Sequence, residues 1–218
     1  MTTLRIGLTS RMIKAPHFNE WRDALAQDWA RQLPVLVPDG QWVALPNIGA
    51  DVVDFAKRWS INAFVLTGGD DIGRTPARDA TETRLLDYAL ESRLPVLGVC
   101  RGLQFLQHYF GGTFTTCSRE AHVNVRHEVT SCGLLPALGP AGTVFTVNSY
   151  HEVGIAKNDL VSDLQSAALA GGGEVEAAIH RNLPVIGIMW HPERNEAVAD
   201  VDVRLFRDLF GKTVAGTT

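Results

Sequence analysis

The chain has 218 residues, of which 45% are hydrophobic, and its 20 basic and 24 acidic residues give a formal net charge of −4. This length and apolar content suit one α/β domain over residues 1–210, followed by a tail, 211–218, that we expect to fray. The charges form no long run of one sign and no apolar segment reaches the length of a membrane span, which argues against nucleic acid and membranes as partners and favours a small-molecule ligand. The three cysteines argue against a disulfide framework and favour a reducing, cytoplasmic compartment.

Short apolar runs rich in β-branched residues alternate with amphipathic segments, a pattern typical of parallel strands joined by crossover helices. The pattern predicts strands over 4–9, 42–45, 63–67, 95–99 and 113–116, and helices over 20–33, 50–59, 81–92, 101–110 and 201–209. In the helix over 81–92, the charged residues facing away from the apolar stripe are Glu82, Arg84 and Asp87. Beyond residue 120, turn residues separate the strand-like runs 143–147, 164–169, 174–179 and 184–189. We therefore expect an α/β fold, a doubly wound and mostly parallel sheet with an antiparallel extension in the C-terminal half.

The segment GVCRGLQ, residues 98–104, follows an apolar run and opens an amphipathic one, which places Cys100 on a sharp turn from a strand into a helix. Gly98 and Gly102 leave room for the backbone to bend tightly without a Cβ collision. The helix beginning at Arg101 points its free amides and positive dipole end at the sulfur, which favours the thiolate. These features predict that Cys100 is a catalytic nucleophile, whereas a cysteine in an arbitrary apolar run would be a small buried hydrophobic residue.

The segment WHPE, residues 190–193, also ends an apolar run and therefore a predicted strand. The carboxyl ends of parallel strands in a doubly wound sheet converge on one crevice, so His191 can meet Cys100 despite their separation in sequence. His191 would accept the Cys100 proton and later protonate the leaving amine, while Glu193 would hold the imidazole in its useful tautomer. The sequence thus predicts a Cys-His-Glu triad.

A third strand end carries LTGGDDIG, residues 66–73, whose paired glycines permit a loop with its amides turned into the crevice. A tetrahedral oxyanion needs such donors, and we expect the backbone amides of Gly69 and Arg101 to supply them. The segment lacks the glycine spacing of a phosphate-binding loop, and Asp70 and Asp71 would repel phosphate. A plain turn is the alternative interpretation of the glycine pair.

The ordered set LTGGDDIG, PVLGVCRGLQ, VNSYHEVGI and PVIGIMWHPE resembles the class I glutamine amidotransferases, and most of all their free-standing γ-glutamyl hydrolase branch. The resemblance covers residues 5–195 and implies a flavodoxin-like sheet and a γ-glutamyl thioester on Cys100. It also implies substrate contacts from Gln104, Asn148, Ser149, Tyr150 and His151. Glu152 and Val153 depart from that branch, which usually has a second His and a Gln in this segment, so we expect the pocket to recognise a different amine-side group.

The N-terminal segment SRMIKAPHFNEWRDALAQDW, residues 10–29, is similar to a smaller group of these enzymes associated with surface-polysaccharide gene clusters, including one that removes glutamate from a γ-glutamyl-CDP-amidate. Such a substrate has a phosphorylated leaving group, to which basic side chains facing the crevice would bind. The candidates for that contact are Arg11, Lys14, Arg22 and Arg74. The alternative for each is a solvated surface charge.

We expect neither a cofactor nor a metal. His122 and His127, in EAHVNVRHEV, are five residues apart and lie on opposite faces if the segment is extended, which argues against a shared metal ion. The triad chemistry needs no metal either.

Two other function classes stay open. A glutaminase subunit would use the same triad to release ammonia for a separate synthetase, which would then be an obligatory partner. A binding or regulatory module with a dead site is the other class, because fold alone does not establish function. The intact set of Cys100, His191 and Glu193 argues against that module. The leaving amine and the oligomeric state stay undetermined.

Overall fold

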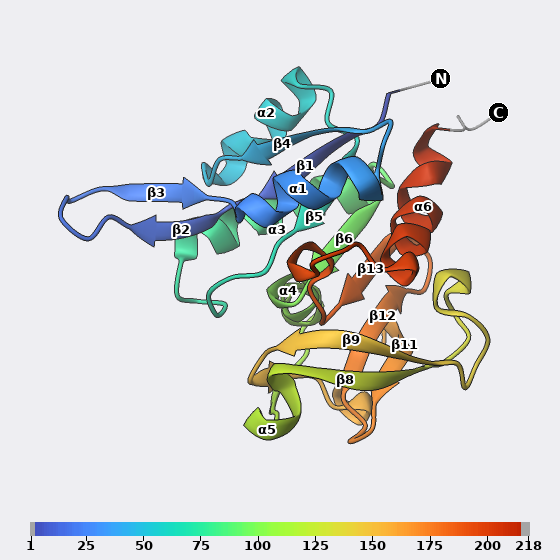
Figure 1. Cartoon of the computed structure of the whole chain (residues 1–218). Helices are drawn as coiled ribbons and strands as arrows, with labels where there is room; N and C mark the ends of the chain where they lie inside the picture. Colours follow the sequence, from blue (N-terminus) through green and yellow to red (C-terminus); the bar gives the residue numbers. More distant parts are fainter. Residues whose placement is uncertain (1–2, 215–218) are drawn as a thin grey trace.

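A nine-stranded sheet runs through the protein in the computed structural model, which describes residues 3–214 (Figure 1). Its parallel half consists, in spatial order, of β4 (Gln41–Leu45), β1 (Arg5–Thr9), β5 (Ala63–Leu66), β6 (Val96–Val99) and β13 (Val185–Ile188). Its antiparallel half continues from β13 with β12 (Val175–His180), β11 (Leu164–Ala170), β8 (Val123–Ser131) and β9 (Val144–Tyr150). The predicted fold class, a parallel sheet with an antiparallel extension, is confirmed.

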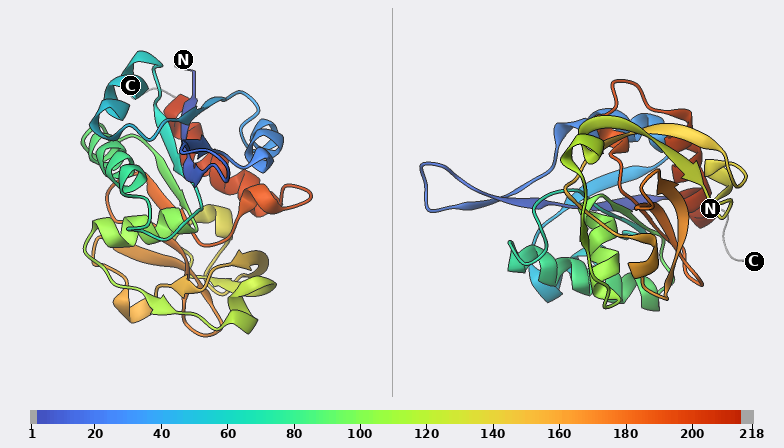
Figure 2. Two further views of the ribbon diagram at one scale, coloured as in Figure 1. Left: turned by 90° about the vertical axis from the view of Figure 1, so that its left-hand side faces the viewer. Right: turned by 90° about the horizontal axis from the view of Figure 1, so that it is seen from below.

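Helices cover both faces of the parallel half, as a doubly wound sheet requires (Figure 2). They are α1 (Gln27–Leu36), α2 (Val52–Arg58), α3 (Pro76–Glu91), α4 (Arg101–Tyr109) and α6 (Asp200–Val214), while α5 (Arg119–His122) is a short turn before β8. One core joins α1 and α6 to the sheet through residues such as Trp29 and Phe206. The other joins α2, α3 and α4 to the opposite face through residues such as Leu86 and Leu103. Strands β5 and β6 are buried along their whole length because helices lie on both sides of them.

The helix predicted over 20–33 is wrong in its first half. Residues Trp21–Ala24 form strand β3, which pairs antiparallel with β2 (Arg11–Lys14), and α1 begins only at Gln27. The resulting hairpin projects from the body of the protein (Figures 1 and 2). Pairing with β2 supplies the backbone hydrogen bonds of this segment and outweighs its helical pattern.

The strand predicted over 113–116 does not belong to the main sheet. Only β7 (Thr115–Thr116) is extended, and it pairs with β10 (Val153–Gly154) in a separate two-stranded sheet. Strand β8 was not predicted, although the alternation of apolar and polar residues along β8 is the usual signal of a half-buried strand. Single 3-10 turns occur at Gly49–Asp51, Pro136–Leu138, Lys157–Asp159 and Pro192–Arg194.

The C-terminal helix is longer than expected. Helix α6 continues to Val214, past Gly211, where we expected a frayed tail to begin. Residues 215–218 of that tail lie outside the described part of the chain. Within residues 3–214, no helix combines the length and apolar character needed to cross a membrane.

Candidate active site

Three neighbouring parallel strands end at one edge of the sheet, and each is followed by one of the predicted motifs. Leu66 of β5 pairs with Gly98 of β6, and Val99 of β6 pairs with Ile188 of β13. The amide of Cys100 donates to the carbonyl oxygen of Ile188 at 2.7 Å, which extends the β6–β13 ladder to Cys100. This register therefore brings Gly68–Gly69, Cys100 and His191 to the same edge.

Cys100 lies on a strained turn between β6 and α4. Its φ of +53° and ψ of −102° are dihedral angles that a residue with a Cβ atom seldom adopts. The turn is tightly packed, because a Cβ atom on Gly98 would lie 2.6 Å from the carbonyl carbon of Gly102, and one on Gly102 would lie 2.2 Å from the oxygen of Leu66. The two glycines thus allow β6, α4 and β5 to approach closely around the cysteine, as the sequence pattern suggested.

His191 is buried between Cys100 and Glu193. Its Nδ1 lies 2.7 Å from Oε1 of Glu193, a short hydrogen bond that leaves Nε2 for the sulfur of Cys100. Burial alone would lower the pKa of His191, but its hydrogen bonds and charge interactions with Cys100 and Glu193 outweigh burial and raise that pKa to about 9. At neutral pH the imidazole therefore holds a second proton beside the sulfur. A Cβ atom on Gly68 would lie 2.7 Å from Cε1 of His191, so the glycine makes room for the ring.

Asn148 holds the backbone of His191 rather than facing a ligand. Its Nδ2 donates to the carbonyl of His191 and its Oδ1 accepts from the amide of His191, each at 2.8 Å. Nδ2 also donates to Oδ1 of Asn195 at 2.9 Å, so both amide hydrogens of this buried side chain are used. Asn148 therefore positions the main chain of His191, and its predicted substrate contact stays a prediction.

Two further predicted substrate residues point away from the triad. Ser149 is fully buried, and its Oγ donates to the carbonyl of His122 at 2.7 Å. His151 is also buried, and its Nε2 lies 3.4 Å from Oε1 of Glu176. Alternation along β9 places Asn148 and Tyr150 on one side and Ser149 on the other, which explains why adjacent residues of one motif separate.

Tyr150 and Gln104 remain beside the triad. The Tyr150 ring is 37% exposed and packs edge-on against the His191 ring, with their centroids 5.6 Å apart. The guanidinium of Arg194 lies over the Tyr150 ring, 4.6 Å from its centroid. Gln104 is buried in α4, and its Nε2 donates to the carbonyl of Val153 at 2.8 Å, which leaves its Oε1 as an acceptor. Gln104 therefore binds the first residue of β10, Val153, which together with Glu152 departs from the hydrolase branch.

A buried ionic network lies beneath the two candidate oxyanion positions. Arg78 donates to the carbonyl oxygens of Thr67 and Gly68 at 2.6 and 3.2 Å, directly before Gly69. Glu82 bridges the side chain of Arg78 to that of Arg101, which also pairs with Asp79. Burial alone would raise the pKa of Glu82, but the neighbouring guanidinium groups outweigh burial and hold that pKa below its usual value. The network thus ties the loop after β5 to the first residue of α4.

The prediction that Glu82 faces away from the core is wrong, because its side chain is fully buried. Arg78 was not predicted to be buried or functional, because an Arg and a Glu four residues apart normally form a solvated pair on a helix surface. A Cβ atom on Gly69 would lie 2.2 Å from Nη1 of Arg78, so this loop requires glycine at its φ of +152°. The sequence spacing of Arg78 and Glu82 does not indicate that they are buried, because their third partner, Arg101, belongs to another helix.

Trp190 and Asp202 support the triad loop from the side of α6. The indole Nε1 of Trp190 donates to Oδ1 of Asp202 at 2.8 Å, and Asn195 donates to the other oxygen of that carboxyl at 3.3 Å. Burial raises the pKa of Asp202 to about 6. The supporting roles of Asn195 and Asp202 were not predicted. Their hydrogen bonds join the segment before α6 to the first turn of that helix, and the sequence pattern does not show that these two segments meet.

The basic candidates differ in their access to this edge. Arg11 lines a cavity of about 30 Å³ together with Gly68, Gly69 and Glu193, and its Nη2 lies 2.9 Å from Oδ1 of Asp70. Arg22, on β3, instead binds Glu20 at 2.5 Å. Two other candidates, Lys14 and Arg74, are exposed at β2 and in the loop before α3. Of these basic residues, Arg11 is the one whose backbone segment and side chain border the glycine loop.

The predicted separation of His122 and His127 is wrong. A bulge between Val123 and Val125, with Asn124 at a φ of +56°, interrupts the alternation of β8. The two imidazoles consequently lie on the same side, with their centroids 4.9 Å apart.

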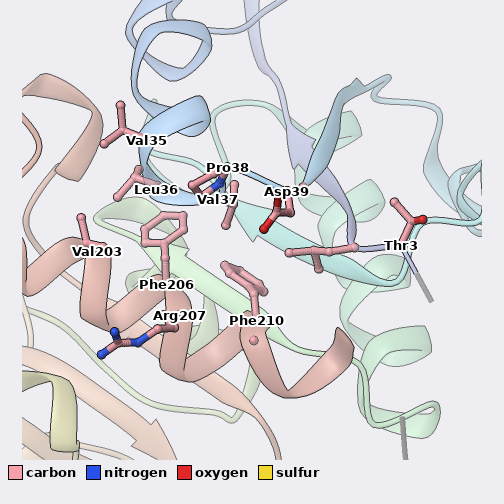
Figure 3. Close-up of a pocket in the computed structure, with 13 residues that line it drawn as sticks. Thr3, Val35, Leu36, Val37, Pro38, Asp39, Val203, Phe206, Arg207 and Phe210 are labelled. Carbon is pink, nitrogen blue, oxygen red and sulfur yellow. The ribbon is translucent and has the colours of Figure 1, made fainter. Parts of the chain in front are cut away.

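A larger cavity, of about 530 Å³, lies away from the triad (Figure 3). Its wall contains Phe206 and Phe210 of α6, opposite Val35 and Leu36 of α1, and residues at the amino ends of β1 and β4. Because the triad lies at the carboxyl ends of the parallel strands, this cavity is at the opposite edge of the sheet.

Comparison with known proteins gives a consistent assignment. Residues 34–193 match the Peptidase C26 family. Over 205 residues the chain is 31% identical to the gamma-glutamyl-CDP-amidate hydrolase of Campylobacter jejuni, covering 91% of this chain and 94% of that one. Over 149 residues it is 36% identical to the gamma-glutamyl-gamma-aminobutyrate hydrolase of Escherichia coli O157:H7, covering 59% and 58% of the two chains. A glutamine amidotransferase from Thermotoga maritima has the same fold, with a TM-score of 0.64 at 13% identity over 99% of this chain and 87% of that one.

These matches agree with the sharp turn at Cys100 and the strand-end motifs described above. The chain belongs to the Peptidase C26 family of class I glutamine amidotransferase-like hydrolases.

Proposed function

We propose that this hydrolase cleaves the amide bond of a small γ-glutamyl conjugate and releases glutamate, with Cys100 as nucleophile, His191 as acid and base, and Glu193 as the orienting carboxylate. The observation that carries the proposal is the pairing of a strained cysteine with a histidine whose Nδ1 lies 2.7 Å from Oε1 of Glu193. The relatives that are named as gamma-glutamyl hydrolases support a γ-glutamyl amide as the bond that is cleaved.

The reaction has two steps. The Cys100 sulfur attacks the γ-carbonyl carbon, the C–N bond breaks, and His191 gives its proton to the departing amine, which leaves a glutamyl thioester on Cys100. Water then attacks the thioester, His191 takes a proton from that water, and release of glutamate returns the cysteine. In each step the carbonyl oxygen becomes negatively charged, and the backbone amides of Gly69 and Arg101 would stabilise that charge.

Two side chains are placed to recognise the glutamyl end. The free Oε1 of Gln104 would accept a hydrogen bond from the substrate ammonium, because the Nε2 of that side chain is already bound to Val153. Tyr150, partly exposed beside His191, would form the apolar wall of the pocket.

The leaving group is proposed to carry phosphate. Support comes from the Campylobacter jejuni relative, which is named for a CDP-amidate substrate and is matched over 94% of its length. Arg11, at the rim of the glycine loop, is suited to donate hydrogen bonds to a phosphate, because its guanidinium is partly exposed and its partner Asp70 also lies at the surface.

The experiment measures glutamate release by the purified protein from glutamine and from γ-glutamyl amides with and without a phosphorylated amine portion. We expect the phosphorylated conjugate to have the highest kcat/KM, since leaving-group contacts made in the transition state lower the barrier. Cys100→Ala should lower kcat by about 10⁴-fold or more, whereas Cys132→Ala, the matched control, should not change it. Release of ammonia from glutamine only after addition of a synthetase would instead support a glutaminase subunit.

A second comparison tests the phosphate contact. Arg11→Ala should lower kcat/KM for the phosphorylated conjugate selectively, while Arg22→Ala, in the same hairpin, should have little effect. An equal loss for phosphorylated and unphosphorylated substrates would rule out phosphate recognition by Arg11.

A further inference from the structure

Three histidines and a glutamate meet in the antiparallel half of the sheet, outside the triad. His122 ends α5, His127 lies on β8, His151 follows β9, and Glu176 lies on β12. The His122 ring centroid is 4.9 Å from that of His127 and 4.8 Å from that of His151. The Glu176 side chain is fully buried, and those of His122 and His151 are nearly so. Four groups that can bind a metal therefore converge in a region closed to solvent.

The polar atoms of this cluster lack partners. Within residues 3–214, neither oxygen of Glu176 has a hydrogen-bond partner, nor does Nδ1 of His122, Nε2 of His127 or either ring nitrogen of His151. Buried polar groups in native proteins are nearly always satisfied, because each unpaired one destabilises the fold. So many unpartnered donors and acceptors that face one another indicate a bound group that would satisfy them.

The spacing of these atoms fits a metal better than direct hydrogen bonds. Oε1 of Glu176 lies 3.6 Å from Nδ1 of His122 and 3.4 Å from Nε2 of His151, and Oε2 lies 3.5 Å from Nε2 of His127. A charge-assisted hydrogen bond would bring such atoms to about 2.7–2.9 Å. Two ligand atoms of a tetrahedral zinc ion, each bonded at about 2.0–2.1 Å, lie about 3.3 Å apart. The three distances from Glu176 to the imidazoles are therefore compatible with a shared metal ion.

The side-chain chemistry agrees with this interpretation. The fully buried carboxylate of Glu176 lies among three imidazoles. Imidazole nitrogens and carboxylate oxygens are common ligands of divalent transition metals.

We propose that His122, His127 and Glu176 bind a divalent transition metal ion, for which Zn²⁺ has the best-matched ligand chemistry. The ligand atoms of these three residues all lie within 4.8 Å of one another. His151, beside the same carboxylate, is the nearest imidazole for a fourth position. Cys117 also approaches His122 and His151. We assign the imidazoles and the carboxylate as ligands because neither oxygen of Glu176 has a hydrogen-bond partner among the described residues.

The ion would have a structural role that reaches the candidate active site. The carbonyl of His122 accepts hydrogen bonds from both Oγ of Ser149 and the amide of His151, which flank Tyr150. Tyr150 in turn packs against His191. A metal bound to His122 would thus fix the end of β9 and with it one wall beside the triad.

The test uses the full chain with Cys100→Ala as background, so that the triad thiol does not bind metal. Chelator-treated protein is titrated with Co²⁺ and followed by its visible absorption, then with Zn²⁺ and followed by metal content and Tm. We expect about one ion per chain, absorption bands typical of nitrogen and oxygen ligation at low coordination number, and a Tm that rises with Zn²⁺. Absence of both the Co²⁺ bands and the Tm rise in this unmutated cluster would overturn the proposal without relying on any variant that might misfold.

Variants then locate the ion. His127→Gln and Glu176→Gln should each weaken Zn²⁺ binding by at least about 10-fold, while the matched control His180→Gln, on β12 but outside the cluster, should bind as the background does. His127 is the most informative position because its side chain, 15% exposed, is the least buried of the three proposed ligands, which lowers the risk of misfolding. Equal Zn²⁺ affinity in His127→Gln, Glu176→Gln and His180→Gln would place the ion elsewhere and refute the assignment.

Discussion

The side chain of Asn148 binds both main-chain polar groups of His191. Its Nδ2 donates to the carbonyl oxygen of His191, and its Oδ1 accepts from the amide nitrogen, each at 2.8 Å. The contact joins the outermost strand of the sheet, β9, to the loop after β13. The orientation of the imidazole therefore depends on a strand whose own pairing partner, β8, carries His127.

Replacing Asn148 tests this dependence. Asn148→Ala should lower kcat by about 10- to 100-fold with little change in KM, because it loosens the residue proposed to transfer protons, while both amide hydrogens of Asn148 are already bound within the protein. Thr146→Ala, at an exposed position of the same strand, is the control. A rise in KM at constant kcat would return Asn148 to a substrate-binding role.

Gly68 should be intolerant of even one methyl group. In Gly68→Ala the new Cβ would lie 2.7 Å from Cε1 of His191, which pushes the ring away from Cys100 and Glu193. We expect kcat to fall by about 10²-fold while the chain stays folded. Gly171→Ala, where a Cβ would meet nothing, provides the comparison, and full activity in Gly68→Ala would show that the ring has freedom that its burial does not suggest.

The stability of the protein should fall as the pH rises above neutrality. The pKa of His191 is about 9 in the folded protein, whereas the unfolded chain titrates near 6.5, so the native state holds the more protons between these values. The stabilisation is complete below about pH 6.5 and is lost as the pH rises through about 9. Urea unfolding at a series of pH values measures this loss, which should be smaller in Glu193→Gln; an unchanged slope in that variant would contradict the assignment.

Glu82 should be among the residues most important for stability. Glu82→Gln leaves the buried guanidinium groups of Arg78 and Arg101 without their shared carboxylate, and breaking a buried pair in this way costs about 3–5 kcal/mol. The free energy of unfolding in urea measures the cost, with Glu91→Gln, exposed at the end of the same helix, as the control. A loss below about 1 kcal/mol would mean that water replaces the carboxylate.

The parts of the fold and site that follow from local patterns could be predicted from the sequence. Strands β5, β6 and β13 are short, wholly apolar runs that end one to three residues before Gly68, Cys100 and His191, so both the strands and their meeting point follow from the parallel topology. Residues whose environment depends on distant elements could not be predicted. Glu82 looks like a surface residue until Arg101 of another helix reaches it, and His122 joins His127 only because a bulge at Asn124 breaks the strand period. The hairpin at Trp21–Ala24 has the same cause, since its pairing with β2 overrides an amphipathic pattern.

The backbone angles of Cys100 have a consequence for evolution. A positive φ at a residue with a Cβ atom costs on the order of 1–3 kcal/mol, and glycine would avoid that cost. Cys100→Gly should therefore be more stable than the natural protein while lacking the thiol. Selection for stability alone would favour glycine at this position, so a cysteine in this conformation is what we expect if the sulfur atom at the carboxyl edge of the sheet has the proposed role.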